Sequence, residues 1–185
     1  GVGHALVGVP VAGWLVALVL QVVVVLLLGR GLRAREPEAM SLGAANLVTL
    51  TRSVLTCGVA GLVAVPSADV PPAVIVALAA SALVLDAVDG RVARRTGTVT
   101  RLGARFDMET DALLILALSW SVVGEVGPWV LAIGLARYLL WVAQRLSPVL
   151  RGDLPARRWR KAVAAIQGVA LLVVASGLLP RPVSV

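Results

Sequence analysis

The sequence predicts an all-α integral membrane protein with about six transmembrane helices. Hydrophobic residues make up 59% of the 185 residues and charged residues 15%, whereas a soluble domain averages roughly 45–50% and about 25%. The apolar residues gather in six long segments, and most Lys and Arg residues lie between alternate segments. One Cys and one His exclude a disulfide framework and a zinc site built from Cys and His.

Each apolar segment is expected to form one helix across the membrane. The six segments are 9–28, 46–65, 73–85, 107–123, 128–146 and 162–179. The first is interrupted only by Gln21 and is long enough to span alone, because about 20 apolar residues cross the hydrocarbon layer. It does not resemble a secretory signal, because no basic residue precedes it. Segment 73–85 is short, and continuation of its helix to Arg94 would lengthen it on the polar side.

The connections between the segments differ in charge, and this difference predicts the orientation. Connections 29–45, 89–106 and 147–161 are rich in Arg, whereas connections 66–72 and 124–127 contain no Lys or Arg. Because basic loops stay inside, we expect a protein of the cytoplasmic membrane with both termini outside. The net charge of +7 does not indicate a nucleic-acid partner. A nucleic-acid site usually spreads its basic residues over one solvated face, often with aromatic residues between them.

Four aspartates stand near the cytoplasmic ends of two neighbouring predicted helices. Asp86 and Asp89 are three residues apart, and Asp107 and Asp111 are four apart, so each pair shares a helix face. Taken singly, each could finish a helix and pair with a nearby Arg. Two facing helices, however, would bring all four carboxylates together, and their repulsion favours bound cations. With no Cys or His nearby, all-oxygen ligation favours Mg²⁺ or Mn²⁺ over Zn²⁺.

The residues around the aspartates suit a phosphorylated ligand. Gly90 and Ala93 follow Asp86 at helical spacings and leave a bare strip for a nucleotide, and Gly103 gives similar clearance before Asp107. Arg94 is placed to neutralise a pyrophosphate. Two metal ions can steady both the attacking and the leaving oxygen of a phosphoryl transfer. The pattern therefore predicts a two-metal phosphoryl-transfer site that faces the cytoplasm.

This pattern resembles the signature of the CDP-alcohol phosphotransferase family, also called CDP-alcohol phosphatidyltransferases. The string Asp86-x2-Asp89-Gly90-x2-Ala93-Arg94-x8-Gly103-x3-Asp107-x3-Asp111 fills all eight fixed positions of the signature within 26 residues. Upstream, Asn46, Thr49 and Arg52 look like the residues that open the family's first span. The resemblance covers roughly residues 41–179, which is most of the chain.

The resemblance implies an enzyme of phospholipid biosynthesis, commonly a homodimer of six-span chains. An acceptor hydroxyl would attack the β-phosphorus of a CDP-linked donor, here expected to be CDP-diacylglycerol, and release CMP. By this resemblance the metal ligands are Asp86, Asp89, Asp107 and Asp111. Asp107 and Asp111 would also be catalytic, Asp111 as general base for the acceptor. The residues that border CDP would be Asn46, Thr49, Arg52, Gly90, Ala93, Arg94 and Gly103.

The chain departs from the family pattern in two places. One span precedes the Asn-Thr-Arg segment, so we expect an extra helix and basic linker in residues 1–40 and the transferase domain in residues 41–185. That domain would be either cut short at its C-terminus or completed by the first helix. Members that use a phosphorylated acceptor often carry a basic residue directly after the last aspartate, where this chain has Ala112. An anion pocket for the acceptor could instead be built from Arg105, Arg137, Arg158 and Lys161.

Some features keep other interpretations open. A small transporter also holds acidic residues within its spans, but near the midplane rather than at one end. An intramembrane prenyltransferase binds a diphosphate through Asp-rich motifs and Mg²⁺, without the glycine, alanine and arginine spacing found here. Arg137 lies inside an apolar segment, which makes it a candidate site residue. It could equally extend toward the cytoplasm with Arg145 or pair with a site aspartate, and attraction to anionic lipid could explain the basic residues at 157–161.

Overall fold

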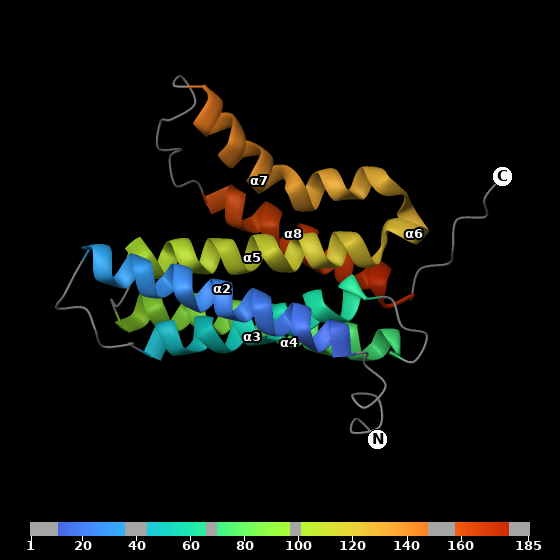
Figure 1. Cartoon of the computed structure of the whole chain (residues 1–185), viewed down its shortest axis with the longest axis horizontal. Coiled ribbons are helices and arrows are strands. Elements are labelled where there is room, and N and C mark those ends of the chain that lie inside the picture. Colours follow the sequence, from blue (N-terminus) through green and yellow to red (C-terminus); the bar gives the residue numbers. More distant parts are fainter. Residues whose placement is uncertain (1–10, 36–43, 66–69, 97–100, 148–157, 178–185) are drawn as a thin grey trace.

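The computed structural model describes residues 11–35, 44–65, 70–96, 101–147 and 158–177 (Figure 1). Within these ranges, the side chains of residues 31–35, 44–46, 89–96, 101–102 and 158–161 lie outside the description. The described part is helical and contains no strand, which confirms the predicted all-α class there. Its elements are α2 (Val11–Arg35), α3 (Ala44–Ala64), α4 (Pro72–Thr96), α5 (Arg101–Ser121), α6 (Val123–Val126), η1 (Pro128–Val130), α7 (Leu131–Leu146) and α8 (Arg158–Ala175).

The six expected apolar segments all fold as helices in the described residues, and several helix ends differ from the segment ends. Helix α4 continues to Thr96, as its polar extension predicted, and α5 begins at Arg101, six residues before the apolar segment does. The segment from residue 128 opens with the short 3-10 helix η1 before α7 starts. Gly127 precedes η1 with φ 100°, a left-handed conformation that glycine adopts without strain, and Pro128 follows it.

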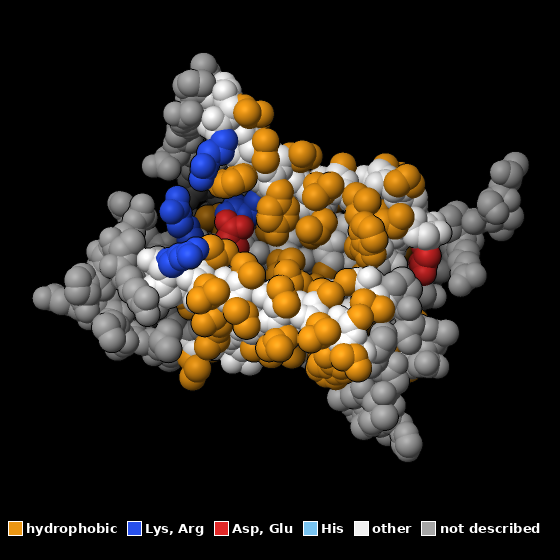
Figure 2. All heavy atoms as spheres, in the orientation of Figure 1, with side chains coloured by type: hydrophobic (Ala, Val, Ile, Leu, Met, Phe, Trp, Pro, Cys, Tyr) orange, Lys and Arg blue, Asp and Glu red, His pale blue; other side chains and the backbone are white. Residues whose placement is uncertain are grey.

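Two of the described helices are long and apolar enough to cross a membrane. They are Val11–Arg30 and Leu47–Ala64, while Pro72–Val88 and Ala162–Ala175 are apolar but shorter. Most of the apolar side chains of Val11–Arg30 are exposed, as expected for a helix that faces lipid. Figure 2 shows hydrophobic side chains over most of the visible face. The number of six spans stays a prediction.

The long helices run along a common direction and alternate in orientation (Figure 1). The C-terminal ends of α2, α4 and α7 therefore lie at the same end of the bundle as the N-terminal ends of α3, α5 and α8. The exposed Arg30, Arg105 and Arg145 and the half-buried Arg137 gather there as well (Figure 2). This arrangement agrees with the alternation expected from the basic and uncharged connections.

Helix α3 is central because it packs against α2, α4 and α5, while α8 contacts α4 and α5, and α7 packs on α5. Helices α3, α4, α5 and α8 all contribute to the hydrophobic core, for example through Val59, Ala79, Leu118 and Leu171. Gly61 lets α2 come close: a Cβ at this position would lie 2.4 Å from the carbonyl oxygen of Gly13. Small residues at such crossings are typical of helices that pack within membranes. The tight packing fixes the helix that carries Arg52.

Candidate active site

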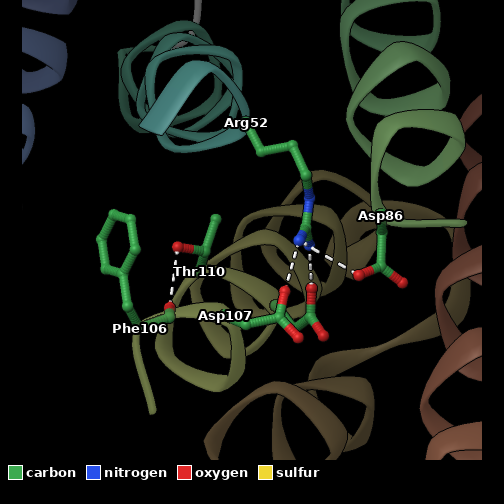
Figure 3. Close-up of polar contacts among 6 residues, drawn as sticks. Arg52, Asp86, Phe106, Asp107 and Thr110 are labelled. Atoms are coloured by element: carbon green, nitrogen blue, oxygen red, sulfur yellow. Dashed lines mark hydrogen bonds and ion pairs between the residues drawn. The ribbon is translucent and has the colours of Figure 1, made fainter. Parts of the chain in front are cut away.

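Arg52 lies at the centre of a cluster of carboxylates near the end of the bundle where α3 begins. Its side chain is 1% exposed and extends from α3 toward α4 and α5 (Figure 3). The Nη1 atom lies 3.0 Å from Oδ1 of Asp86 on α4, and it also donates a hydrogen bond to Oδ1 of Asp107 on α5. The Nη2 atom donates to Oδ1 of Asp111, one turn further along α5. We call Asp86, Asp107 and Asp111 the carboxylate cluster.

The local sequence explains why these side chains meet. Asp107 and Asp111 are four residues apart, so they project from the same face of α5. Between them on the sequence, Thr110 is buried and donates a hydrogen bond to the carbonyl oxygen of Phe106 at 3.0 Å (Figure 3). Helix α3 packs against both α4 and α5, so the long side chain of Arg52 reaches both. The sequence predicted the meeting of the aspartates but not the guanidinium among them.

The carboxylate cluster has the composition of a site for a hard divalent cation. One carboxylate oxygen from each of its three residues lies within 4.8 Å of the others. The side chains of Asp86, Asp107 and Asp111 are 40%, 25% and 32% exposed, so they are reachable from outside the bundle. If all three are ionised, one guanidinium leaves the group with a formal charge of −2. Oxygen ligands and excess negative charge suit Mg²⁺ or Mn²⁺.

The Nε atom of Arg52 is buried and has no hydrogen-bond partner among the residues that the structure describes. A buried donor without a partner is costly, and an arginine cannot relieve the cost by losing its charge. The guanidinium is therefore well paired at its two terminal nitrogens and unsatisfied at its third. The unsatisfied Nε is a donor that a hydrogen-bond acceptor could pair with.

The structure places the other expected CDP-binding residues unevenly. Thr49 is buried on α3, one turn before Arg52, and Gly103 is half-buried on α5, one turn before Asp107. Asn46 lies on α3, but its side chain is outside the described residues. The same holds for Asp89, Gly90, Ala93 and Arg94 on α4. The contribution of these residues to the site stays a prediction.

Arg137, one of the expected acceptor-binding residues, forms an ion pair between helices. From α7, its Nη2 pairs with Oε1 of Glu109 on α5, its Nε donates to Oε2 at 3.3 Å, and Nη1 lies 3.7 Å from Sδ of Met108. Arg137 thus has an acidic partner, but this partner is a glutamate beside the cluster rather than one of the aspartates. Arg105 is exposed on α5. Arg158 and Lys161 begin α8, and their side chains lie outside the described residues.

Two contacts near the site were missed by the sequence analysis. Glu109 lies two residues from each α5 aspartate and so faces a different side of the helix. The sequence feature that could have indicated its ion pair is Arg137, a charged residue within an apolar segment that needs an acidic partner. Gln21 on α2 hydrogen-bonds Ser53 on α3, with 3.1 Å between Nε2 and Oγ. Ser53 also donates to the carbonyl oxygen of Leu50 at 2.7 Å. The sequence feature that could have indicated the contact with Ser53 is Gln21, the single polar residue within an apolar segment.

Comparison with known proteins agrees with these observations. The family model described as CDP-alcohol phosphatidyltransferase matches residues 42–183, which include α3 to α8 and the whole carboxylate cluster. Two curated proteins from two strains of Mycobacterium tuberculosis, each named "Probable phosphatidylglycerophosphate synthase", are 34% identical to the chain over 110 residues. The alignment covers 58% of this chain and 50% of each relative, so the chain spans about half the length of the curated relatives it matches. No solved structure gives a significant match. On the family match, the chain belongs to the CDP-alcohol phosphatidyltransferase family, a family of transferase enzymes.

Proposed function

We propose that the protein transfers a phosphatidyl group from CDP-diacylglycerol to the hydroxyl of a small acceptor and releases CMP. The observation that carries the proposal is the meeting of Asp86, Asp107 and Asp111 around Arg52, within the region that matches the family. A lipid donor suits this site because two of the helices are apolar enough to lie in a bilayer. The carboxylates are partly exposed at one end of the bundle, where a water-soluble acceptor can reach them.

The residues of the site divide into ligands and a base. Asp86, Asp89, Asp107 and Asp111 would hold two Mg²⁺ or Mn²⁺ ions, which would supply positive charge to the phosphate oxygens during transfer. Asp111 also supplies the carboxylate oxygen that we assign as base, which accepts the proton of the acceptor hydroxyl. The acceptor oxygen bonds to the β-phosphorus, and the bond from that phosphorus to the oxygen shared with CMP breaks.

Substrate binding is assigned to residues on both sides of the cluster. The CDP moiety would lie against α3, α4 and α5, bordered by Asn46, Thr49, Arg52, Gly90, Ala93, Arg94 and Gly103. The name of the two relatives indicates a product made of a phosphatidyl group and glycerol phosphate, so glycerol 3-phosphate is the acceptor to test first. Ala112 is buried, and a basic side chain at that position would be packed among helices. The acceptor phosphate would therefore bind elsewhere, at a pocket formed from Arg105, Arg137, Arg158 and Lys161.

We place the protein in the cytoplasmic membrane with the carboxylate cluster toward the cytoplasm. Exposed arginines gather at the end of the bundle nearest the cluster (Figure 2), and basic residues are retained on the cytoplasmic side. Residues 1–40 would add a membrane helix to the transferase domain, which begins at residue 41. A second copy of the chain is the partner we expect.

The test is CMP release by purified protein in detergent with CDP-diacylglycerol, Mg²⁺ or Mn²⁺, and one acceptor at a time. We expect release that depends on glycerol 3-phosphate and stops with EDTA. Asp111→Asn should reduce it at least about a hundredfold, since a general base typically contributes about 10²–10⁴-fold. Glu125→Gln is the matched control, because Glu125 is an exposed carboxylate on α6, at the opposite end of the bundle. A transporter or a prenyltransferase would release no CMP with any acceptor, and that result would refute the proposal.

A further inference from the structure

We infer that Arg52 is an exchangeable counter-cation of the carboxylate cluster. It holds the oxygens of Asp86, Asp107 and Asp111 until a divalent cation binds them, and its guanidinium then turns to the phosphates of the CDP-linked donor. The inference rests on the proposed function, because it assumes that these carboxylates bind a divalent cation. It adds a direct energetic link between metal binding and donor binding, carried by one side chain.

Arg52 and a metal ion need the same three carboxylates. Arg52 contacts Oδ1 of all three aspartates, and carboxylate oxygens of these residues lie within 4.8 Å of one another. Oxygens on opposite sides of an octahedral Mg²⁺ are about 4.2 Å apart, since each bond is about 2.1 Å long. One carboxylate oxygen from each residue thus lies close to the spacing of an ion's ligands, within the group of carboxylates that the guanidinium already occupies. Arg52 and an ion cannot both use the inward lone pairs of those oxygens.

Arg52 and a metal ion approach the carboxylates from different directions. Arg52 enters from α3 and is 1% exposed, whereas the three carboxylates are 25–40% exposed. A metal ion and a phosphorylated donor would reach the carboxylates from the exposed side, opposite the root of the arginine. The guanidinium can therefore break its hydrogen bonds to the carboxylates and bind an anion at nearly the same place. This change does not require the helices to move apart.

Arg52 needs an anionic partner both at the carboxylates and at the donor phosphates. Its charge is permanent at any physiological pH, and its Nε atom has no partner among the described residues while it pairs with the cluster. Phosphate oxygens accept two parallel hydrogen bonds from a guanidinium. A diphosphate beside the cluster would supply the charge that the aspartates provide before the ion binds. Metal ion and donor should consequently strengthen each other's binding, and by the same factor.

A measurement of metal affinity distinguishes an Arg52 that competes with the ion from an Arg52 that only holds the carboxylates in position. If Arg52 competes with the ion, removal of its charge tightens metal binding. If Arg52 only holds the carboxylates in place, its removal lets them repel and separate, and metal binding weakens. The two roles thus predict changes of opposite sign, and neither sign requires a measurement of turnover.

The experiment is a titration of Mn²⁺ into the full chain in detergent, with free Mn²⁺ measured by electron paramagnetic resonance. We expect Arg52→Gln to bind Mn²⁺ at least about tenfold more tightly than wild type, within the usual range of coupling between sites. Arg30→Gln, which removes an exposed charge from α2, controls for net charge and should change the affinity less than about twofold. Saturating CDP should tighten Mn²⁺ binding about tenfold in wild type but less than about threefold in Arg52→Gln.

Each outcome has a distinct meaning. Wild-type protein that binds no Mn²⁺ would overturn the metal site of the proposed function. Wild-type binding together with unchanged or weaker binding by Arg52→Gln would overturn the inference alone. Should Arg52→Gln fail to fold, Arg52→Lys replaces it, because lysine keeps the charge but lacks the planar fork that bonds several oxygens at once. Arg52→Lys should bind Mn²⁺ more tightly than wild type, and weaker binding would overturn the inference.

Discussion

Replacing Gly61 by Ala is expected to push α2 away from α3. An ideal Cβ at Gly61 would lie 2.4 Å from the carbonyl oxygen of Gly13 and 2.8 Å from Cβ of Ala17, whereas ordinary contact begins at 3.4 Å. The closest pair must therefore separate by about 1 Å to reach ordinary contact. Because the obstacle is backbone rather than the tip of a side chain, the whole helix has to shift.

Gly58 provides the matched control, because a Cβ there would meet nothing within 4 Å. Alanine in place of glycine within a helix stabilises by roughly 0.5–1 kcal/mol, and both variants gain this term. Only Gly61→Ala also bears the cost of overpacking, about 1–3 kcal/mol. Since 1 kcal/mol shifts the Tm of a chain of this size by about 2–4 °C, Gly61→Ala should unfold roughly 2–12 °C below Gly58→Ala.

The assay is thermal unfolding in detergent, followed by circular dichroism at 222 nm for wild type and both variants. Gly61→Ala should fall below wild type or match it, and Gly58→Ala should match or exceed wild type. Equal midpoints for the two variants would refute the close approach of α2 and α3. The same separation would lengthen the contact between Gln21 and Ser53.

Three further predictions concern polar contacts. Asp107→Asn should lower CMP release at least about a hundredfold while the helical circular dichroism stays that of wild type; substantial turnover would contradict the role of this carboxylate. Gln21→Leu should lower the Tm by about 2–4 °C, because it removes a partner of the buried Ser53 hydroxyl, and adding Ser53→Ala should recover most of the loss. The side chains of the ion pair between Glu109 and Arg137 are 57% and 35% exposed. A double-mutant cycle by thermal unfolding should therefore give a coupling energy of about 0.2–1 kcal/mol that salt reduces. A coupling energy above about 2 kcal/mol would show that the pair is shielded from solvent.

The fold was largely predictable because apolar segments of membrane length have few alternatives to a helix. Each of the six expected segments became a helix, and their alternating direction followed from the positions of the basic connections. Helix ends were less predictable, as α5 shows by starting at Arg101. Polar residues at a helix end continue the same hydrogen-bond pattern, so hydropathy alone does not mark where the helix starts.

The candidate site was predictable only in part. The spacing of Asp107 and Asp111 placed both on one face of one helix, which is a local property of the backbone. The contacts of Arg52 are not local, because Asp107 and Asp111 lie 55 and 59 residues further along the chain. Sequence alone assigned Arg52 to the nucleotide and gave no indication that it pairs with the carboxylates.

The sequence by itself determined which segments form helices, which ends of those helices are basic, and which aspartates share a face. These properties depend on composition and on the 3.6-residue period of the helix. Only the tertiary structure decided that Arg52 stands among the carboxylates, that Glu109 is the partner of Arg137, and that Gly61 admits α2. Those contacts depend on which helices become neighbours and how closely they approach. The packing of side chains between distant segments sets that distance, and no spacing within one helix encodes it.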